Sequence, residues 1–342
     1  MINHDRYVEF CASRNLKKST RKGYETAITL YEKYTGNSID ELINEARLQE
    51  EDNIPLKKRK IKTKLINFRT SLIESDLSPN TAKTYFSKIK SFYKHYEIEI
   101  PTLPRTSWGK IYETNYLDLP TRIHIQQAIE ISAPDMKAII LFMTSSGTAK
   151  AETLSLTVED FINATYKYHK AKTIQEALNR ISTKKNMIPT FYLKRKKTNK
   201  YYYTFCSPEA ATYIVKYLKT RTNLKAKDKL FPLSNSQLIN RFQKINDQMN
   251  WGWKGKYRFF RAHTLRKFHA SNIGLIPEYI DLLQGRGKNE IHETYIKTNP
   301  EKLKIIYREA MDNILIFKDK KEVTEEFRIT INLLGEGYEI IL

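Results

Sequence analysis

Residues 261–272 read "RAHTLRKFHASN" and place His263 three positions before Arg266, with Lys267 and His269 close behind. Residues three apart lie on the same face of an α-helix, so the first two side chains can reach one oxyanion. Arginine offers a planar fork of donors that matches phosphate, and histidine can exchange a proton near pH 7. The same pattern also fits a basic helix that faces water. The choice depends on what the rest of the chain supplies.

The composition indicates a folded protein with a polyanionic partner. The 342 residues include 40% hydrophobic residues, 22 tyrosines and 15 phenylalanines, enough for a buried core in two domains. Lys and Arg total 59 against 38 Asp and Glu, which gives a net charge of +21. Such an excess is typical of proteins that neutralise nucleic-acid phosphates, although ribosomal or membrane-surface binding would also account for it.

We expect a cytoplasmic, nucleoid-associated protein that does not enter a membrane. The sequence has no apolar run of membrane-spanning length, and "MINHDRYVEF" (residues 1–10) lacks a signal-peptide pattern. Two cysteines, Cys11 and Cys206, predict neither a disulfide framework nor a zinc cluster, which indicates a reducing compartment. The sequence contains no GxGxxG, Walker A or metal-ligand spacing, so we expect no cofactor and no metal.

Residues 1–100 are expected to form a helical DNA-binding domain. The stretches 16–36 and 77–97 carry apolar residues at spacings of three and four, which put each set on one helical face. Ser19 or Ser78 can cap the start of its helix. The opposite faces are basic and suit a phosphate backbone, although a solvated face explains each lysine equally well. The predicted DNA-contacting residues here are Lys17, Lys18, Arg21, Lys22, Lys83, Lys88 and Lys90.

A linker is predicted at residues 101–116, where prolines favour extended backbone. Residues 117–318 are expected to form a second domain, so that the whole chain is mainly α with a small β-sheet. A hairpin is predicted within residues 187–207, because β-branched and aromatic residues flank a turn there. The tail 319–342 packs on its own domain or on a neighbouring copy. Helical patterns in the second half cover residues 208–219, 235–249, 263–274 and 277–284.

Two further features accompany the opening stretch. Pro277 and Gly285 bracket a short helix, as expected for the first and the first post-helical positions. Arg286 follows at once, and Tyr295 comes nine residues later. The predicted hairpin also crowds basic residues at its turn, where a side chain can enter a DNA groove or simply face water. These residues are Lys194, Arg195, Lys196, Lys197 and Lys200.

In combination these features resemble the tyrosine recombinase (phage integrase) family. They are the lysine-bearing hairpin, "HTLR" at 263–266, the helix ending in a glycine turn, and the late tyrosine. "LQGR" (283–286) and "TFCSPEA" (204–210) look most like integrases of archaea and their mobile elements. The resemblance covers about residues 5–315. It implies a helical core-binding domain and an α+β catalytic domain that together form a clamp around DNA.

The resemblance implies a DNA strand transferase that needs neither metal nor ATP. Tyr295 would attack the scissile phosphate and form a 3′-phosphotyrosyl bond, which stores the energy needed for rejoining. Arg266 would stabilise the charge that develops on the non-bridging oxygens. His263 would assist proton transfer at the nucleophile or the phosphate.

Further roles follow from the same resemblance. Lys197 would protonate the leaving 5′ oxygen, with Lys196 and Lys194 as alternatives if the register of the turn differs. Arg286 stands where many members have histidine or tryptophan, and its role would be electrostatic. Lys267 is expected to contact the DNA backbone.

The implied partner is double-stranded DNA that carries an attachment site. Recombination between two sites needs a homotetramer on synapsed DNA, and we expect a monomer or dimer in the absence of DNA. The implied reaction is the integration or excision of a mobile element, such as a viral genome.

The chain departs from the family at one catalytic position. The family pattern TG-x-R-x-x-E-L corresponds to "SSGTAKAETLSL" (145–156), where Ala149 stands in the place of the arginine. Lys150 is the next residue, and we interpret it as the functional substitute. Lysine offers a point charge and no bidentate fork, so we expect slow cleavage that Lys150→Arg accelerates. Glu152 is expected to orient neighbouring basic groups, although a carboxylate on a helix surface is an equally good interpretation.

Two other functions stay open. The missing arginine also fits a DNA-binding protein that keeps the fold without turnover. A type IB topoisomerase would share the chemistry and would relax supercoils without sequence preference.

Overall fold

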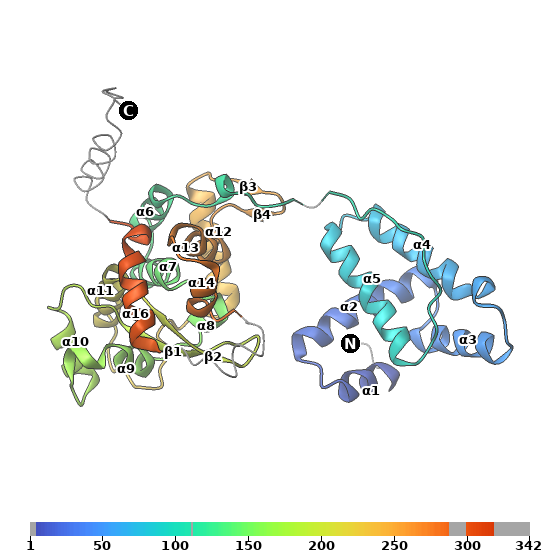
Figure 1. Ribbon diagram of the computed structural model, residues 1–342, viewed down its shortest axis with the longest axis horizontal. Coiled ribbons are helices and arrows are strands. Elements are labelled where there is room, and N and C mark those ends of the chain that lie inside the picture. The colour runs from blue at the N-terminus through green and yellow to red at the C-terminus, as the bar shows by residue number, and fades with distance from the viewer. Residues whose placement is uncertain (1–4, 111, 287–298, 318–342) are drawn as a thin grey trace, which may run out of the picture. The chain divides into compact units, whose positions relative to one another are not determined.

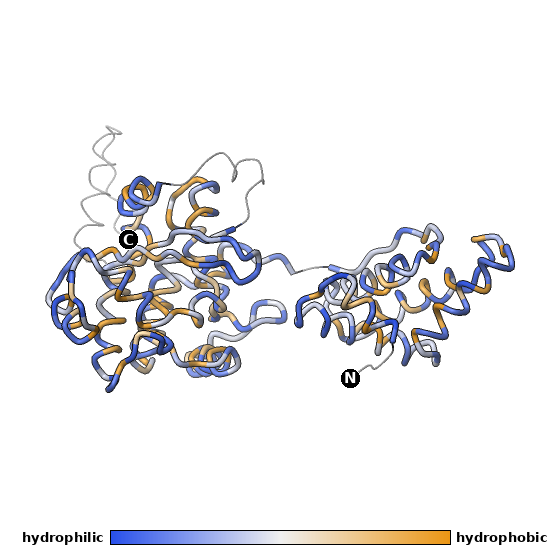
Figure 2. The backbone as a smooth tube through the Cα atoms, turned by 90° about the horizontal axis from the view of Figure 1, so that it is seen from below, coloured by the Kyte–Doolittle hydropathy of each residue, from blue (hydrophilic) through white to orange (hydrophobic). Residues whose placement is uncertain are grey.

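The computed structural model describes residues 5–110, 112–286 and 299–317. The chain divides into two compact units, residues 1–113 and 114–342. Within the described residues the chain is mainly helical with two small β-hairpins, which confirms the predicted fold class (Figure 1). Hydrophobic and hydrophilic residues alternate every few positions along the helices, as expected where one face of each helix is buried (Figure 2).

The first unit is a bundle of α-helices. In order, they are α1 (Asp5–Ser13), α2 (Lys18–Thr35), α3 (Ile39–Glu51), the 3-10 turn η1 (Leu56–Lys58), α4 (Lys60–Glu74) and α5 (Pro79–His95). Helices α2 and α5 are the two that the sequence pattern paired, and they pack against each other. Their apolar positions, including Ile28, Tyr31, Ile89 and Phe92, are fully buried.

The two expected helix caps have different outcomes. The Ser78 hydroxyl accepts a hydrogen bond from the backbone N–H of Thr81 at 3.3 Å, so the cap of α5 is confirmed. The prediction for Ser19 is wrong, because α2 already begins at Lys18 and its N-cap residue Lys17 forms no side-chain cap. Ser19 therefore lies inside the first turn.

Residues that follow α5 return along the helical unit. Ile98 is buried, and the ring of Trp108 packs against Phe86 with centroids 5.6 Å apart. The Arg69 guanidinium donates a 2.7 Å hydrogen bond to the main-chain oxygen of Pro104. Much of the segment for which the sequence predicts a linker is thus packed on the first unit, and the division of the chain falls near its end, between residues 113 and 114.

The second unit contains the two hairpins and most of the helices. Its elements before the main hairpin are η2 (Tyr116–Asp118), α6 (Arg122–Glu130), α7 (Pro134–Ser146), α8 (Lys150–Thr153), α9 (Val158–His169) and α10 (Ile174–Ile181).

The main hairpin and the elements after it complete this unit. They are β1 (Thr190–Lys194), β2 (Tyr201–Phe205), α11 (Pro208–Lys219), α12 (Asn235–Gln248), β3 (Trp253–Lys254), β4 (Tyr257–Arg258), α13 (Ala262–Asn272), α14 (Pro277–Leu283), α16 (Pro300–Ala310) and η3 (Met311–Ile314). The four helices predicted for this half, α11 to α14, are present within about two residues of their expected bounds. The tail 319–342 lies outside the described residues.

Helix α7 forms the centre of the second unit. It is apolar on all sides, and ten of its residues from Met136 to Ser146 are buried. A helix without a polar face must be surrounded, and α6, α11 and α13 pack around it (Figure 1). Gly147 ends the helix in the left-handed conformation with φ of 63°. This end of α7 positions the candidate site.

The predicted hairpin is confirmed as an antiparallel pair of strands, with Leu193 opposite Tyr202. Phe191, Leu193 and Tyr202 are buried, whereas Tyr192 between them is exposed, as the alternation of a strand requires. The turn passes through Asn199, whose φ is 60°, a conformation that asparagine tolerates better than most residues.

Candidate active site

Arg266 lies at the junction of three helices. Its side chain comes from α13 and the residue is only 5% exposed. Nη1 donates to the main-chain oxygen of Gly147, at the end of α7, at 2.6 Å, and Nη2 donates to that of Gln284, at the end of α14, at 2.8 Å. These bonds use two of the five N–H groups of the guanidinium. Arg266 is thereby held in a fixed position.

The Arg266 guanidinium carries its charge in a buried, cationic setting. Burial, together with the neighbouring cations Arg195 and Arg286, lowers its pKa to about 10, although Tyr202 and Glu152 act in the opposite direction. Arg266 is still protonated at pH 7. A buried cation that other cations crowd is stabilised when an anion binds beside it.

His269 and Gln284 fix the surroundings of Arg266. The Gln284 side-chain Nε2 donates to the main-chain oxygen of Arg266 at 3.1 Å and lies 2.9 Å from Nδ1 of His269. Burial lowers the pKa of His269 to about 3, so the imidazole is neutral and its Nδ1 accepts the amide hydrogen. Neither residue was among the site residues predicted from the sequence. The signal in the sequence for His269 was its position three residues after Arg266, which places the two side chains on the same face of a helix.

The turn of the main hairpin is bound to Glu152, a carboxylate that is 2% exposed. Arg195 forms an ion pair with it, with Nη1 3.0 Å from Oε2. The backbone N–H of Lys196 donates to the other oxygen, Oε1, at 3.0 Å. Glu152 therefore contacts the basic turn, in agreement with the expectation that it orients neighbouring basic groups.

Tyr202 connects the hairpin to the end of α14. Gly285 has φ of 59°, and a Cβ atom there would lie 2.6 Å from Cδ1 of Tyr202. The tyrosine ring thus lies directly against the glycine that follows Gln284. Burial raises the pKa of Tyr202, and its buried hydroxyl has no hydrogen-bond partner among the described residues.

His263 lies one turn before Arg266 in α13 and is exposed. Desolvation lowers its pKa, and the nearby Arg261, Lys267 and Arg266 lower it further. These effects favour the neutral imidazole, the form that can accept a proton. Burial, followed by the charge of Arg261, also lowers the pKa of Lys267, which is half-buried.

Of the remaining catalytic candidates, the structure describes Lys150, Arg286 and Lys197. Lys150 is the first residue of α8, half-buried, and burial lowers its pKa. Arg286 forms an ion pair with Asp281 at 3.5 Å and lies close enough to lower the pKa of both His263 and Arg266. Lys197 is exposed in the hairpin turn. Tyr295 lies outside the described residues.

Comparison with known proteins yields no matching family model and no matching curated protein. Solved structures do match. A lambda integrase tetramer bound to a Holliday junction has 15% sequence identity and a TM-score of 0.56, over 86% of this chain and 78% of that one. The fold is that of lambda integrase. A lambda integrase dimer bound to a core site has 14% identity and a TM-score of 0.54, over 86% of this chain and 97% of that one.

A third match extends the same fold to a transposon enzyme. The Tn1549 transposon integrase in complex with circular intermediate DNA has 13% identity and a TM-score of 0.51, over 88% of this chain and 97% of that one. These structures are all recombinases or integrases, as the sequence resemblance predicts. At this identity they establish the integrase fold, and the likeness to archaeal integrases stays a prediction.

In the integrase fold, the basic turn residues have different surroundings. Lys194, Lys196 and Lys197 are exposed, and the Lys194 ammonium lies 5.5 Å from the ring centre of Tyr201. Lys200 and Arg195 are half-buried. The side chains of the three lysines are thus at the surface, whereas the Arg195 guanidinium lies against Glu152.

The predicted DNA-contacting residues of the first unit are mostly exposed. Lys88 and Lys90 are the half-buried ones: their ammonium groups lie 4.8 Å and 5.2 Å from the ring centres of Tyr24 and Phe86. Burial lowers the pKa of Lys88. The exposed members are Lys17, Lys18, Arg21, Lys22 and Lys83.

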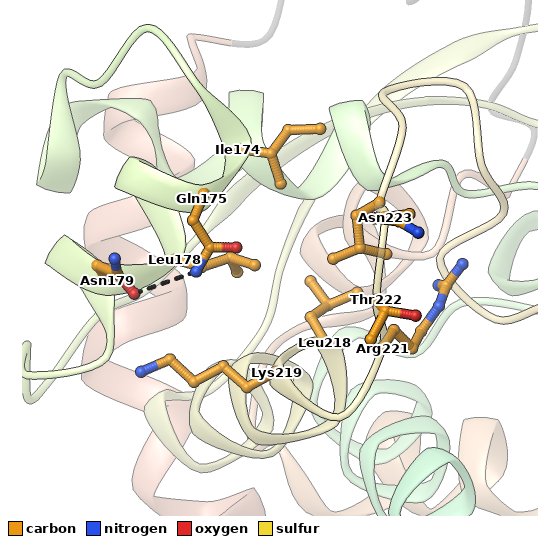
Figure 3. Close-up of a pocket in the computed structure, with 10 residues that line it drawn as sticks. Ile174, Gln175, Leu178, Asn179, Leu218, Lys219, Arg221, Thr222 and Asn223 are labelled. Carbon is orange, nitrogen blue, oxygen red and sulfur yellow. Dashed lines mark hydrogen bonds between the residues drawn. The ribbon is translucent and has the colours of Figure 1, made fainter.

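Other features of the described residues contribute nothing to this site. A hollow of about 640 Å³ lies between α10 and the end of α11, where Figure 3 shows Leu178, Leu218 and Arg221. None of the predicted site residues lines it. Cys11 and Cys206 are buried and unpaired thiols. Among the described helices, none has the length and apolarity required to cross a membrane.

Proposed function

We propose that this chain is a site-specific DNA recombinase that breaks and rejoins DNA through a 3′-phosphotyrosyl intermediate. The observation that carries the proposal is the buried guanidinium of Arg266, crowded by other cations within an integrase fold. The excess of positive charge around Arg266 favours a bound phosphate. The net charge of +21 favours a polyanionic partner for the whole chain. The biological reaction we propose is the integration or excision of a mobile element.

The proposed reaction is a transesterification. The phenolic oxygen of Tyr295 forms a bond to the scissile phosphorus, and the bond from phosphorus to the 5′ oxygen breaks. Arg266 neutralises charge on the non-bridging oxygens as the transition state forms, with the electrostatic help of Arg286. The reverse attack by a 5′ hydroxyl rejoins the strand, so neither ATP nor a metal is required.

Proton transfer requires a base and an acid of suitable pKa. Desolvation and neighbouring cations lower the pKa of His263, which favours the neutral imidazole, and this form can accept the proton of the tyrosine hydroxyl. Lys197 would deliver a proton to the leaving 5′ oxygen. Its position in an exposed turn suits a residue that enters a DNA groove, and Lys194 and Lys196 are the alternatives.

Double-stranded DNA with an attachment site is the proposed substrate. Exposed basic residues of both units would contact phosphates on either side of the cleavage point as the two units enclose the duplex. Synapsis of two sites would take four copies of the chain, with a monomer or dimer in the absence of DNA.

Cleavage is expected to be slow if Lys150 takes the place of the missing arginine. A lysine point charge stabilises the transition state less than a guanidinium, and the loss of one such donor typically costs about 10²–10³ in rate. Under this prediction Lys150→Arg accelerates strand cleavage.

The proposal is tested by the capture of a covalent intermediate. Duplexes that bind the full chain are first selected from a randomised pool. Each is then nicked close to the cleavage point, so that the short product diffuses away and rejoining fails. We expect a protein–DNA adduct on a denaturing gel that disappears in Tyr295→Phe. Tyr166→Phe, which changes an exposed tyrosine of α9, is the matched control and retains the adduct.

Two results would favour the other functions. Site-specific binding without any adduct would identify a DNA-binding protein that lacks turnover. Relaxation of supercoiled plasmid without site preference would identify a type IB topoisomerase.

A further inference from the structure

The cation that pairs with Glu152 comes from the hairpin. Residues three apart on a helix share a face, so position 149 is where a basic residue on the same segment would meet Glu152. That position holds Ala149, the N-cap of α8, whose methyl group cannot pair with a carboxylate. Arg195 fills the requirement instead, with Nη1 3.0 Å from Oε2 and a side chain that is 16% exposed.

Backbone hydrogen bonds hold Arg195 in this position. Its N–H donates to the oxygen of Lys200 at 2.7 Å, and its own oxygen accepts from the N–H of Asn199 at 2.8 Å. The next residue, Lys196, donates its N–H to Glu152 at 3.0 Å. The guanidinium is therefore positioned before any ligand arrives, which is what transition-state stabilisation requires.

The hairpin that carries Arg195 is also linked to Arg266 through Tyr202 and the end of α14. Leu193, two residues before it, pairs with Tyr202, whose ring lies against Gly285. The preceding residue, Gln284, accepts a hydrogen bond from Arg266. Burial is the largest cause of the lowered pKa of Arg266, and the charge of Arg195 is the second largest. The charges of the two guanidinium groups therefore act on each other.

We propose that Arg195 supplies a second guanidinium to the scissile phosphate, in place of the arginine that position 149 lacks. Glu152 is its positioning residue. In the ion pair, Nη1 of Arg195 is the atom closest to Glu152, and a guanidinium carries five N–H groups, so others remain for a non-bridging oxygen. This inference rests on the proposed recombinase function. It assigns to Arg195 the role that the sequence analysis gave to Lys150.

A purely structural role for the ion pair makes different predictions. If Arg195 only anchors the hairpin, its replacement would impair folding and leave no specific effect at the phosphate. Arg195→Ala leaves Glu152 buried without its cation, which is destabilising. The double variant Arg195→Ala with Glu152→Gln removes this charge, and Arg195→Lys keeps the ion pair while losing the fork.

The first measurement detects contact with phosphate without the need for cleavage. Full-length protein binds a set of selected duplexes in which one phosphate at a time is a neutral methylphosphonate. The phosphate that Arg266 contacts is identified with the Arg266→Ala variant. A methylphosphonate at that phosphate weakens binding of wild type but no longer weakens binding of the variant. The penalty is the factor by which neutralisation of a phosphate weakens binding. At the same phosphate, we expect this factor to be about tenfold smaller in the double variant at residues 195 and 152 than in wild type. Lys172→Ala, which changes an exposed lysine beside α10, is the matched control and should retain the penalty.

The second measurement follows cleavage of the nicked substrate. Arg195→Lys and the double variant should cleave about 10²–10³ times more slowly than wild type, whereas the control Lys172→Ala should cleave at the wild-type rate. Ala149→Arg, added to the double variant, should restore cleavage in part, because it returns a guanidinium to the helix start. A role confined to hairpin anchoring would not allow this rescue.

The outcomes separate the two proposals. Absence of any adduct with wild type overturns the recombinase function, while the methylphosphonate measurement still decides whether Arg195 contacts phosphate. An unchanged penalty in the variant of residues 195 and 152, at the phosphate that Arg266 contacts, overturns the assignment of Arg195. Loss of that penalty in Lys150→Ala instead assigns the role to Lys150.

Discussion

Gly147 lies directly against the imidazole of His269. A Cβ atom on residue 147 would be 2.7 Å from Nδ1 of His269 and 2.8 Å from Nε2 of Gln284. The carbonyl of Gly147 accepts a hydrogen bond from Arg266 at 2.6 Å. The end of α7 therefore contacts both α13, which carries Arg266, and Gln284, which hydrogen-bonds to Arg266. This close approach is possible because Gly147 has no side chain.

Gly147→Ala is expected to destabilise the second unit strongly. The residue has φ of 63°, where a side chain costs about 1–2 kcal/mol, and the clash with His269 and Gln284 adds about 1–3 kcal/mol. Gly36→Ala is the matched control, because Gly36 has φ of 73° but nothing within 4 Å of its Cβ position. Urea unfolding of both variants measures the difference. Equal losses of unfolding free energy would show that the contact with His269 is unimportant.

Stability should decrease on acidification through the titration of His269. Its pKa is about 3 in the folded protein and about 6.5 in the unfolded chain, so only the unfolded chain binds the proton between these values. The free energy of unfolding then falls as pH falls from about 6.5 toward 3, by at most about 1.4 kcal/mol per pH unit.

His269→Asn tests this contribution, because the amide oxygen can still accept from Gln284 but does not titrate. The difference in unfolding free energy between wild type and variant should be constant above pH 7 and shrink in acid. A difference that stays constant down to pH 4 would contradict the assignment.

Ser78→Ala should destabilise the first unit by about 1 kcal/mol, because it removes the hydrogen bond that caps α5. Ser19→Ala is the natural control. Ser19 is exposed inside the first turn of α2, and its replacement should change the free energy of unfolding by less than about 0.5 kcal/mol. Thermal unfolding of the two variants distinguishes them. A loss of stability in Ser19→Ala that equals the loss in Ser78→Ala would argue against these helix starts.

Exposed lysines of the first unit should contribute to DNA affinity through counterion release. Replacing Lys18, Lys22 and Lys83 by Gln is expected to reduce the slope of log K against log salt by about 3, at about 0.9 per phosphate contact. The same charge is removed in a control that replaces Lys172, Lys184 and Lys185, exposed residues that flank α10. Fluorescence anisotropy at several salt concentrations gives both slopes. Identical slopes in the two variants would show that the predicted face does not bind DNA.

Local sequence patterns were sufficient to predict the main hairpin and helices α11 to α14 of the second unit. Alternating aromatic and β-branched residues predicted the hairpin, and Pro277 and Gly285 marked the ends of α14. The same holds for His263 and Arg266, whose spacing of three puts them on one helical face. Each of these properties depends on neighbours within a few residues, where backbone preference and side-chain periodicity act directly. The start of α2 was missed because Ser19 offered a capping residue two positions too late.

The amino-acid order alone therefore predicted the two packed helices of the first unit, the main hairpin with helices α11 to α14, and the residue types that could bind a phosphate. Only the tertiary structure decided the partners: Arg266 bonds to Gly147 across 119 positions of the chain, and Glu152 pairs with Arg195 of the hairpin and not with a neighbour on its own helix. No local spacing encodes such contacts, because they arise when buried helices and strands are packed together and each buried charge must find a counter-charge. Arg195, which in the sequence is one of several basic residues in a turn, is thus the partner of the buried Glu152 carboxylate.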